Sequence, residues 1–211
     1  MKRLALIGSK EFAQQIRYFA EKPGEFTIVG YFDDYLESGT LVEGLPVLGK
    51  CCEIEKEYQK GSFDQIFLAA GYNNFQFREA TFMKLKGKVP FANIIMPRVT
   101  IGKNVTFGEG IYVGDDSVIG PNSIIEDNVF IHGNTFLAHD NKVCKHSYLA
   151  GRIDTAGFCE IGERNFVGIR ALFSDHVKTC PDVWIGIGCM ILKSIKESGK
   201  YMSNAKLFKI E

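Results

Sequence analysis

An aliphatic residue recurs every six positions through the second half of the chain. Amphipathic helices need spacings of three and four, so this period indicates short strands instead. The residue that follows the aliphatic one is usually Gly, Ala, Ser or Cys. The frame runs through Ile95, Ile101, Phe107, Val113, Ile119, Ile125, Ile131, Leu137, Val143, Leu149, Thr155, Ile161, Val167, Phe173, Thr179, Ile185 and Ile191. This hexapeptide pattern predicts a parallel β-helix, in which three strands make one triangular coil and each inward side chain stacks on the residue eighteen positions away.

A solenoid of this kind has a dry aliphatic interior, so ligands must bind on the outer faces of the prism. Flat faces with exposed strands are best protected by burial against copies of the same chain, usually with closed rotational symmetry. A three-sided prism therefore predicts a homotrimer.

The first ninety residues follow another pattern, in which short apolar runs alternate with segments of helical spacing. This alternation predicts an α/β domain with a small, Rossmann-like parallel sheet. Strands are expected at residues 4–7, 27–32, 65–70 and 89–95, and helices at residues 11–20 and from Asn73 or Asn74 to about Lys86. The chain is thus divided into an α/β domain at 1–94, a β-helix at 95–195 and a tail at 196–211.

Polar residues follow the carboxyl ends of the predicted strands, which share the ligand-binding edge of a parallel sheet. An aspartate pair comes about 25 residues after the first glycine, where a Rossmann-like unit places a carboxylate for a ribose. The candidate nucleotide-binding residues are Gly8, Ser9, Lys10, Asp33, Asp34, Gly71 and Asn73. The alternative is a glycine turn beside two solvated aspartates. Because the G-x-G-x-x-G fingerprint is absent, the pattern disfavours a dinucleotide such as NAD.

Charge and composition indicate which kinds of partner the protein is not expected to bind. The chain has 25 basic and 25 acidic residues, and this balance gives no indication of a nucleic-acid or anionic-membrane partner. No apolar stretch approaches the roughly 20 residues that span a bilayer, so a cytoplasmic protein is expected. The six cysteines form no C-x-x-C pair, which favours reduced packing residues over disulfides or a metal site.

His139 is the candidate for chemistry on the solenoid. It occupies an outward slot of the hexapeptide, where Asp140 can raise its basicity or hold its tautomer. Gly157 comes eighteen residues later, so bare backbone is expected beside the imidazole, and its amide N–H could stabilise an oxyanion. The alternative is a surface histidine with an acidic neighbour and a corner glycine. His132 and His146 lie seven residues to either side, out of phase with the repeat, which disfavours a zinc site of the carbonic-anhydrase kind.

The small sheet, the aspartate pair, the hexapeptide solenoid and the histidine–aspartate pair together resemble the bacterial sugar O- and N-acyltransferases of the NeuD/PglD type. The resemblance covers nearly the whole chain. Its most specific segments are Gly30–Asp34, Ala69–Asn74 with Arg78, His139–Asp140, and Asn165–Gly168 together with Gly186–Gly188. The fold that it implies for the repeat is a left-handed β-helix.

The resemblance implies transfer of acetyl from acetyl-coenzyme A to an amine or hydroxyl of a sugar, commonly a nucleotide-linked amino sugar. By that resemblance His139 looks like the general base, Asp140 like the residue that raises its basicity, and Gly157 like the amide that faces the thioester oxygen. The coenzyme would lie in the groove between two subunits, along Ile169 and Ile187.

Four places depart from the family pattern. Tyr148 stands where a second histidine often lies near the coenzyme, and His132 where an asparagine commonly lies near the acceptor sugar. The first turn reads Ser9-Lys10-Glu11 in place of glycine-histidine-glycine. The end of the chain reads Met202-Ser203-Asn204-Ala205-Lys206 in place of glycine-valine-proline-alanine-lysine. These departures bear on the identity of the acceptor and on the adenine end of the coenzyme.

The sequence thus predicts an acetyl-CoA-dependent sugar acyltransferase that needs no metal, with His139 as base. One alternative is acyl transfer to a non-nucleotide acceptor such as an antibiotic or an amino acid, which the aspartate pair disfavours. The other is a trimeric scaffold that binds a sugar nucleotide without catalysis. Binding of acetyl-CoA distinguishes the scaffold from the enzyme.

Overall fold

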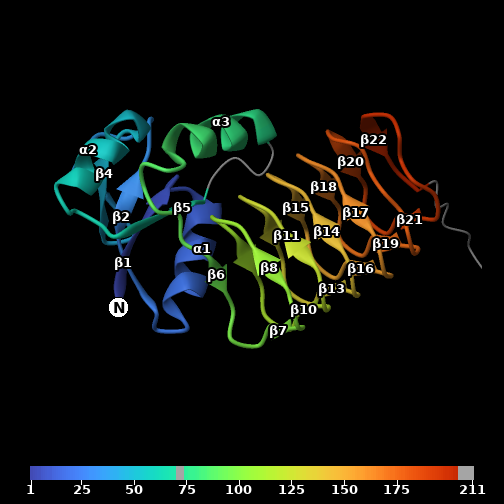
Figure 1. Cartoon of the computed structure of the whole chain (residues 1–211). Coiled ribbons are helices and arrows are strands. Elements are labelled where there is room, and N and C mark those ends of the chain that lie inside the picture. Colours follow the sequence, from blue (N-terminus) through green and yellow to red (C-terminus); the bar gives the residue numbers. More distant parts are fainter. Residues whose placement is uncertain (70–73, 204–211) are drawn as a thin grey trace, which may run out of the picture.

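The computed structural model describes residues 1–69 and 74–203, which form an α/β part followed by a solenoid of short strands (Figure 1). The predicted nucleotide residues Gly71 and Asn73 lie outside the described residues, as does the end of the chain from Asn204. No helix within the described ranges combines the length and the apolarity that crossing a bilayer requires.

The α/β part contains five strands and three α-helices within the described residues. Its elements are β1 (Lys2–Ile7), α1 (Glu11–Glu21), β2 (Phe26–Phe32), β3 (Leu41–Val42), β4 (Leu45–Gly49), the 3-10 turn η1 (Cys51–Glu53), α2 (Ile54–Gln59), β5 (Gln65–Leu68) and α3 (Phe75–Leu85). The strand order is β3-β4-β2-β1-β5; all pairs are parallel except the β3–β4 hairpin. Leu4 and Leu6 of β1 pack into one core cluster, and Ala5 and Ile7 into another. A strand buried on both faces is expected to be apolar, as residues 4–7 of β1 are.

Three parallel sheets form the sides of the solenoid. The aromatic face contains β6 (Ile94–Ile95), β9 (Tyr112–Val113), β12 (Phe130–Ile131), β15 (Tyr148–Leu149), β18 (Phe166–Val167), β20 (Val183–Ile185) and β22 (Gly199–Tyr201). The apolar face contains β7 (Thr100–Ile101), β10 (Val118–Ile119), β13 (Phe136–Leu137), β16 (Asp154–Thr155), β19 (Leu172–Phe173) and β21 (Met190–Ile191). The charged face contains β8 (Thr106–Phe107), β11 (Ile124–Ile125), β14 (Lys142–Val143) and β17 (Glu160–Ile161). The predicted fold class, an α/β sheet followed by a left-handed parallel β-helix, is confirmed.

The frame residues form the solenoid core, and from Val113 to Ile191 every one of them is buried. A buried aliphatic side chain stabilises a fold by roughly 1.5–3 kcal/mol, so the stacked column is a major source of stability. Ile95 and Phe107 are half-buried, and Ile101 has 46% of its surface exposed. It lies on β7, the last strand of its sheet, and has no coil beneath it.

The structure gives a different reason for the small residue after each frame position than the one predicted. We expected it to let the chain turn the corner. A Cβ on Gly102 would instead lie 2.5 Å from the backbone nitrogen of Pro121 in the next coil, so a side chain there is excluded by the approach of the coils. The turn itself is made two residues later, where residues such as Asn104 adopt positive φ angles.

The α/β part packs on the aromatic face through α1. Outward rings on that face stack at eighteen-residue spacing, with centroid distances of 4.3 Å for Tyr112–Phe130, 5.0 Å for Phe130–Tyr148, 5.7 Å for Tyr148–Phe166 and 3.9 Å for Phe166–Trp184. From α1, Phe12 lies 5.2 Å from the Phe130 ring and Phe19 lies 5.9 Å from the Tyr112 ring. Burial of this aromatic surface couples the two parts of the chain.

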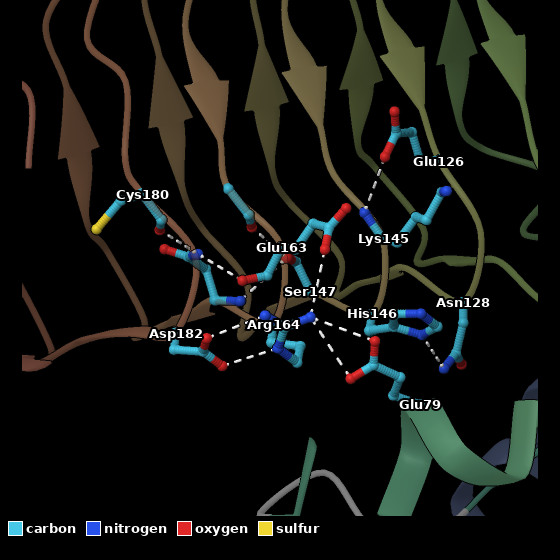
Figure 2. A network of polar contacts seen from close by, with 12 residues as sticks. Glu79, Glu126, Asn128, Lys145, His146, Ser147, Glu163, Arg164, Cys180 and Asp182 are labelled. Atoms are coloured by element: carbon cyan, nitrogen blue, oxygen red, sulfur yellow. Dashed lines mark hydrogen bonds and ion pairs between the residues drawn. The ribbon is translucent and has the colours of Figure 1, made fainter. Parts of the chain in front are cut away.

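A polar network joins α3 to the solenoid (Figure 2). Arg164 Nη1 lies 3.3 Å from Glu79 Oε1 on α3, and Arg164 Nε and Nη2 donate to the Asp182 carboxylate at 2.8 and 3.0 Å. The paired bonds of a guanidinium to a carboxylate fix its plane, which leaves Nη1 aimed at the helix.

The sequence located most elements of the α/β part but not all of them. The strands predicted at 4–7, 27–32 and 65–70 correspond to β1, β2 and β5, whereas β3, β4 and α2 were missed. The strand predicted at 89–95 is wrong: Phe91 makes only a bridge to Ile66, and Ile94–Ile95 pairs with β9 of the solenoid. At the other end, β22 pairs with β20, so part of the predicted tail continues the aromatic face.

Candidate active site and nucleotide cavity

His139 lies on the corner between β13 of the apolar face and β14 of the charged face. Its Nδ1 lies 2.8 Å from Asp140 Oδ2, and 54% of its side chain is exposed. An ionised carboxylate can only accept a hydrogen bond, so in the neutral imidazole Nδ1 carries the hydrogen and Nε2 keeps a lone pair. The pair therefore presents an accessible proton acceptor at the surface.

Gly157 lies directly against the His139 imidazole. A Cβ at this position would lie 2.6 Å from Cε1 and 2.8 Å from Nε2 of the ring. The bare backbone expected beside the imidazole is thus in contact with the ring, and glycine is needed because the ring rests on it. The Gly157 carbonyl accepts a hydrogen bond from His176 N at 3.0 Å, while its N–H has no acceptor among the described groups.

A cavity of about 710 Å³ lies on the other side of the molecule, between the carboxyl edge of the sheet, α1 and the aromatic face. Small-molecule sites in proteins have volumes of about 300–1,000 Å³. The structure brings together the predicted residues Gly8, Ser9, Lys10, Asp33 and Asp34 in its lining.

Both aspartates also hold the wall of this cavity. The buried Asp33 carboxylate accepts hydrogen bonds from Ser9 Oγ at 2.5 Å and from the Tyr35 backbone N–H at 2.9 Å. Asp34 Oδ1 accepts from the Cys51 N–H at 2.8 Å. Asp33 is thus not the solvated aspartate of the alternative interpretation, whereas Asp34 is exposed; both carboxylates order the loop after β2.

The cavity contains a thiol that is unsuited to nucleophilic attack. Burial, together with the nearby charge of Asp34, raises the pKa of Cys51 to about 12. The thiol is therefore protonated at neutral pH, and thiolate chemistry is suppressed.

Lys10 supplies positive charge at the cavity. It is the N-cap residue of α1, and its Nζ lies 5.7 Å from the centroid of the exposed Tyr35 ring. The amino end of a helix and a neighbouring ammonium group both favour an anionic ligand group.

We expect Lys10→Met to weaken binding of a nucleoside diphosphate sugar about fivefold to tenfold at low salt, because an attraction of this kind is lost with the charge and is screened by salt. Calorimetric titration at about 20 mM and about 500 mM NaCl measures the affinities. The difference between wild type and Lys10→Met should be smaller at the higher salt concentration. Lys22→Met is the matched control, since Lys22 lies at the other end of α1 and pairs with Asp115. Equal affinity for both variants would argue against a phosphate contact by Lys10.

Tyr148 and His132 form a pair at the cavity. Tyr148 lines the cavity, and its hydroxyl lies 2.6 Å from His132 Nε2. Burial lowers the pKa of His132 to about 4, so the ring is neutral at pH 7. The structure places Tyr148 beside the predicted nucleotide residues, and its contact with the coenzyme stays a prediction.

Ile169 and Ile187 lie on the corner between the aromatic and apolar faces, with exposed fractions of 43% and 72%. They are neighbours in successive coils, as Gly188 N donates to Ile169 O at 2.9 Å. Neither lines the cavity, and His139 is on the opposite edge of the apolar face. Within one chain the structure brings Ile169 and Ile187 neither to His139 nor to the cavity.

A buried group that the sequence analysis did not identify lies behind α3. Arg78 Nη2 donates to Asn128 Oδ1 at 2.6 Å. The Asn128 amide lies 3.0 Å from His146 Nδ1 (Figure 2). Burial, with the positive charges of Arg78 and Arg164, lowers the pKa of His146 to about 4. His146 is thus a neutral structural residue. The eighteen-residue step of the repeat places Asn128 beside His146, but no sequence signal connects either residue with Arg78.

No cluster of three or more His, Cys, Asp or Glu side chains suited to a metal ion occurs in the described part of the chain. The six cysteines in the described part of the chain are free thiols.

Comparison with known proteins matches two parts of the chain to family models. Residues 3–85 match the PglD N-terminal domain, and residues 94–125 match the bacterial transferase hexapeptide (six repeats). The resemblance inferred from the sequence is confirmed.

Solved structures of similar architecture support the same assignment of the fold. PerB from Caulobacter crescentus, described in complex with CoA and GDP-perosamine, has a TM-score of 0.86 at 24% identity and covers 96% of this chain and 95% of its own. The acetyltransferase domain of PglB from Neisseria gonorrhoeae has a TM-score of 0.82 at 22% identity, covering 97% and 98%.

A curated relative matches a shorter segment. UDP-3-O-acylglucosamine N-acyltransferase from Bordetella avium is 38% identical over 65 residues, which is 31% of this chain and 18% of the length of that relative. These descriptions agree with the predicted acyltransferase class.

Proposed function

We propose that the protein transfers acetyl from acetyl-CoA to an amine or hydroxyl of a nucleotide-linked sugar. One observation carries the proposal: an exposed His139–Asp140 pair stands against Gly157 on a corner of a hexapeptide β-helix. The PglD-type domain and its cavity support a nucleotide-linked acceptor. The description of PerB with CoA and GDP-perosamine supports the same pair of ligands.

In the proposed reaction Nε2 of His139 accepts a proton from the acceptor while its nitrogen or oxygen attacks the thioester carbonyl carbon. The Gly157 N–H donates a hydrogen bond to the oxygen that becomes negative. The C–S bond then breaks, coenzyme A leaves as a thiol with the proton from His139, and the acetylated sugar remains. Asp140 keeps Nδ1 protonated and stabilises the imidazolium that forms.

The two ligands meet only if a second copy of the chain completes the site. The cavity opens near the aromatic face, whereas His139 lies on the far edge of the apolar face. Phe136, Leu172 and Met190 point outward on the apolar face at exposed fractions of 46%, 41% and 68%. We infer that this face is buried in a homotrimer, with Ile169 and Ile187 of one subunit along the coenzyme.

Phe136→Glu places a carboxylate in the middle of the apolar face and is expected to convert the trimer to monomers, since an unpaired charge buried in an interface costs several kcal/mol. Light scattering coupled to size-exclusion chromatography measures the mass. Lys142→Glu places a carboxylate on the charged face, with a larger charge change than Phe136→Glu, and should still leave the trimer intact. A wild-type monomer, or a trimer in both variants, would place the interface elsewhere.

The experiment that tests the function is thiol release from acetyl-CoA with UDP-, dTDP- and GDP-linked 4-amino-6-deoxy sugars and the matching hydroxyl sugars. Release with one acceptor establishes the transferase and identifies its substrate. If no acceptor of the panel supports release, a non-nucleotide acceptor or a binding-only protein is indicated; calorimetry with acetyl-CoA separates these, because the scaffold gives no heat.

A further inference from the structure

Two asparagine side chains lie in a hydrogen-bonded row along the corner of the solenoid that carries the proposed base. Asn104, Asn122 and Asp140 follow one another at eighteen-residue spacing, and all three have positive φ angles, of 59°, 61° and 56°. Asn104 Nδ2 donates to Asn122 Oδ1 at 3.1 Å, and Asn122 Nδ2 donates to Asp140 Oδ1 at 3.2 Å. We call these two amides the asparagine ladder. It ends on the carboxylate whose other oxygen, Oδ2, accepts from His139 Nδ1.

The direction of the ladder is set by the carboxylate. Because an ionised carboxylate only accepts hydrogen bonds, Asn122 must present its nitrogen to Asp140, which leaves its oxygen facing Asn104. Oδ1 of Asp140 is thereby engaged, and rotation of the carboxylate about its Cβ–Cγ bond would break this bond. The bond from Asn122 therefore holds the Asp140 carboxylate in the orientation that places Oδ2 opposite the imidazole.

The coil above the base is aromatic instead of polar. Phe158 takes the next position on the corner, and its ring meets the His139 ring edge-on at a centroid distance of 5.1 Å and 87°. His176 stacks on the other face of Phe158 at 4.8 Å and 6°. The imidazole is thus confined by Phe158 and by the backbone of Gly157, so the bond to Asp140 decides its tautomer.

We propose that Asn122 is a positioning residue for the base: it orients Asp140 so that His139 holds its hydrogen on Nδ1 and leaves Nε2 unprotonated. This inference rests on the proposed function for its catalytic consequence, but the tautomer is a property of the free protein. A structural alternative exists, since other corners of the solenoid also carry asparagine in the same backbone conformation, such as Asn134 with φ 58°.

The test compares Asn122→Gly with Asn134→Gly. Glycine tolerates positive φ, so both variants retain the corner and remove only the side chain. In wild-type protein labelled with ¹⁵N-histidine, at a pH where the ring is neutral, we expect one His139 ring nitrogen with a protonated shift and one with an unprotonated shift. In Asn122→Gly the two shifts should move toward each other as the tautomers mix, and kcat should fall about threefold to tenfold with an unchanged KM for acetyl-CoA, a moderate effect for loss of an outer hydrogen bond.

Asn134→Gly should match wild type in both measurements. Identical His139 shifts and identical kcat in Asn122→Gly and Asn134→Gly would overturn the inference. If the protein transfers no acetyl group to any acceptor, the proposed function fails, and the ¹⁵N shifts alone decide the role of Asn122. Assignment of His139 is direct, because the chain has four histidines and His139→Gln removes one pair of ring-nitrogen signals.

Discussion

His139→Ala is expected to lower kcat for acetyl transfer by about 10²–10⁴-fold, the usual contribution of a general base. The imidazole is the group on this corner that combines exposure, a fixed hydrogen-bond partner and an available lone pair. The KM for acetyl-CoA should change little, since the proposed base acts on the proton of the acceptor. Thiol release at saturating concentrations of both substrates measures the loss.

His176→Ala is the matched control for this experiment. His176 is exposed and lies on the same corner two coils further on, but it stacks on Phe158 and does not contact His139. Its variant should retain at least about half of wild-type kcat, as expected for a surface substitution. Full turnover by His139→Ala would refute the assignment of the base.

Gly157→Ala is expected to lower kcat by about 100-fold, the loss that a misplacement of about 1 Å can cause. The new Cβ would lie 2.6–2.8 Å from two atoms of the His139 ring, so the imidazole must move away from the backbone. That movement changes the distance from Nε2 to the Gly157 N–H as well as the bond to Asp140. A crystal structure of the variant should show the displaced ring.

Gly162→Ala separates this catalytic effect from an effect on folding. A Cβ on Gly162 would approach the carbonyl oxygens of Thr179 and Cys180 in the next coil, which are backbone atoms and cannot turn aside. We therefore expect a thermal midpoint several degrees lower, from strain of about 1–3 kcal/mol. Gly157→Ala should keep the wild-type midpoint, because the nearest group is a side chain on the surface. A large drop for Gly157→Ala would mean that its loss of activity reports unfolding.

The solenoid could be predicted from the sequence because its contacts are periodic. Each coil buries the same position of the repeat, so Val113 and Ile131 are equivalent residues of successive coils and the pattern recurs along the sequence. The α/β part has no such repetition. The β3–β4 hairpin has a strand of two residues, Leu41–Val42, and includes Pro46 opposite Leu41, a pattern too short for period-two alternation.

The strand predicted at 89–95 failed for a related reason. Its apolar residues are shared between two partners, since Phe91 contacts β5 and Ile94 pairs with Tyr112. Hydrophobicity records that a residue is buried but not against which element it is buried. The same limit applies to Tyr148, whose position in the repeat was clear while its neighbours across the cavity were not.

The sequence by itself determined the β-helix, its inward slots, the adjacency of His139 and Asp140, and the eighteen-residue step that brings Gly157 to the imidazole. These depend on local order and on a regular repeat. Only the tertiary structure decided that Gly157 supports the ring, that Ser9 bonds Asp33, and that Tyr148 faces the cavity with the predicted nucleotide residues. The Ser9–Asp33 bond joins residues whose separation follows no repeat, and Tyr148 meets the nucleotide residues only because the α/β part packs on the aromatic face. The eighteen-residue step brings Gly157 to His139, but which atoms meet depends on the orientation of the ring.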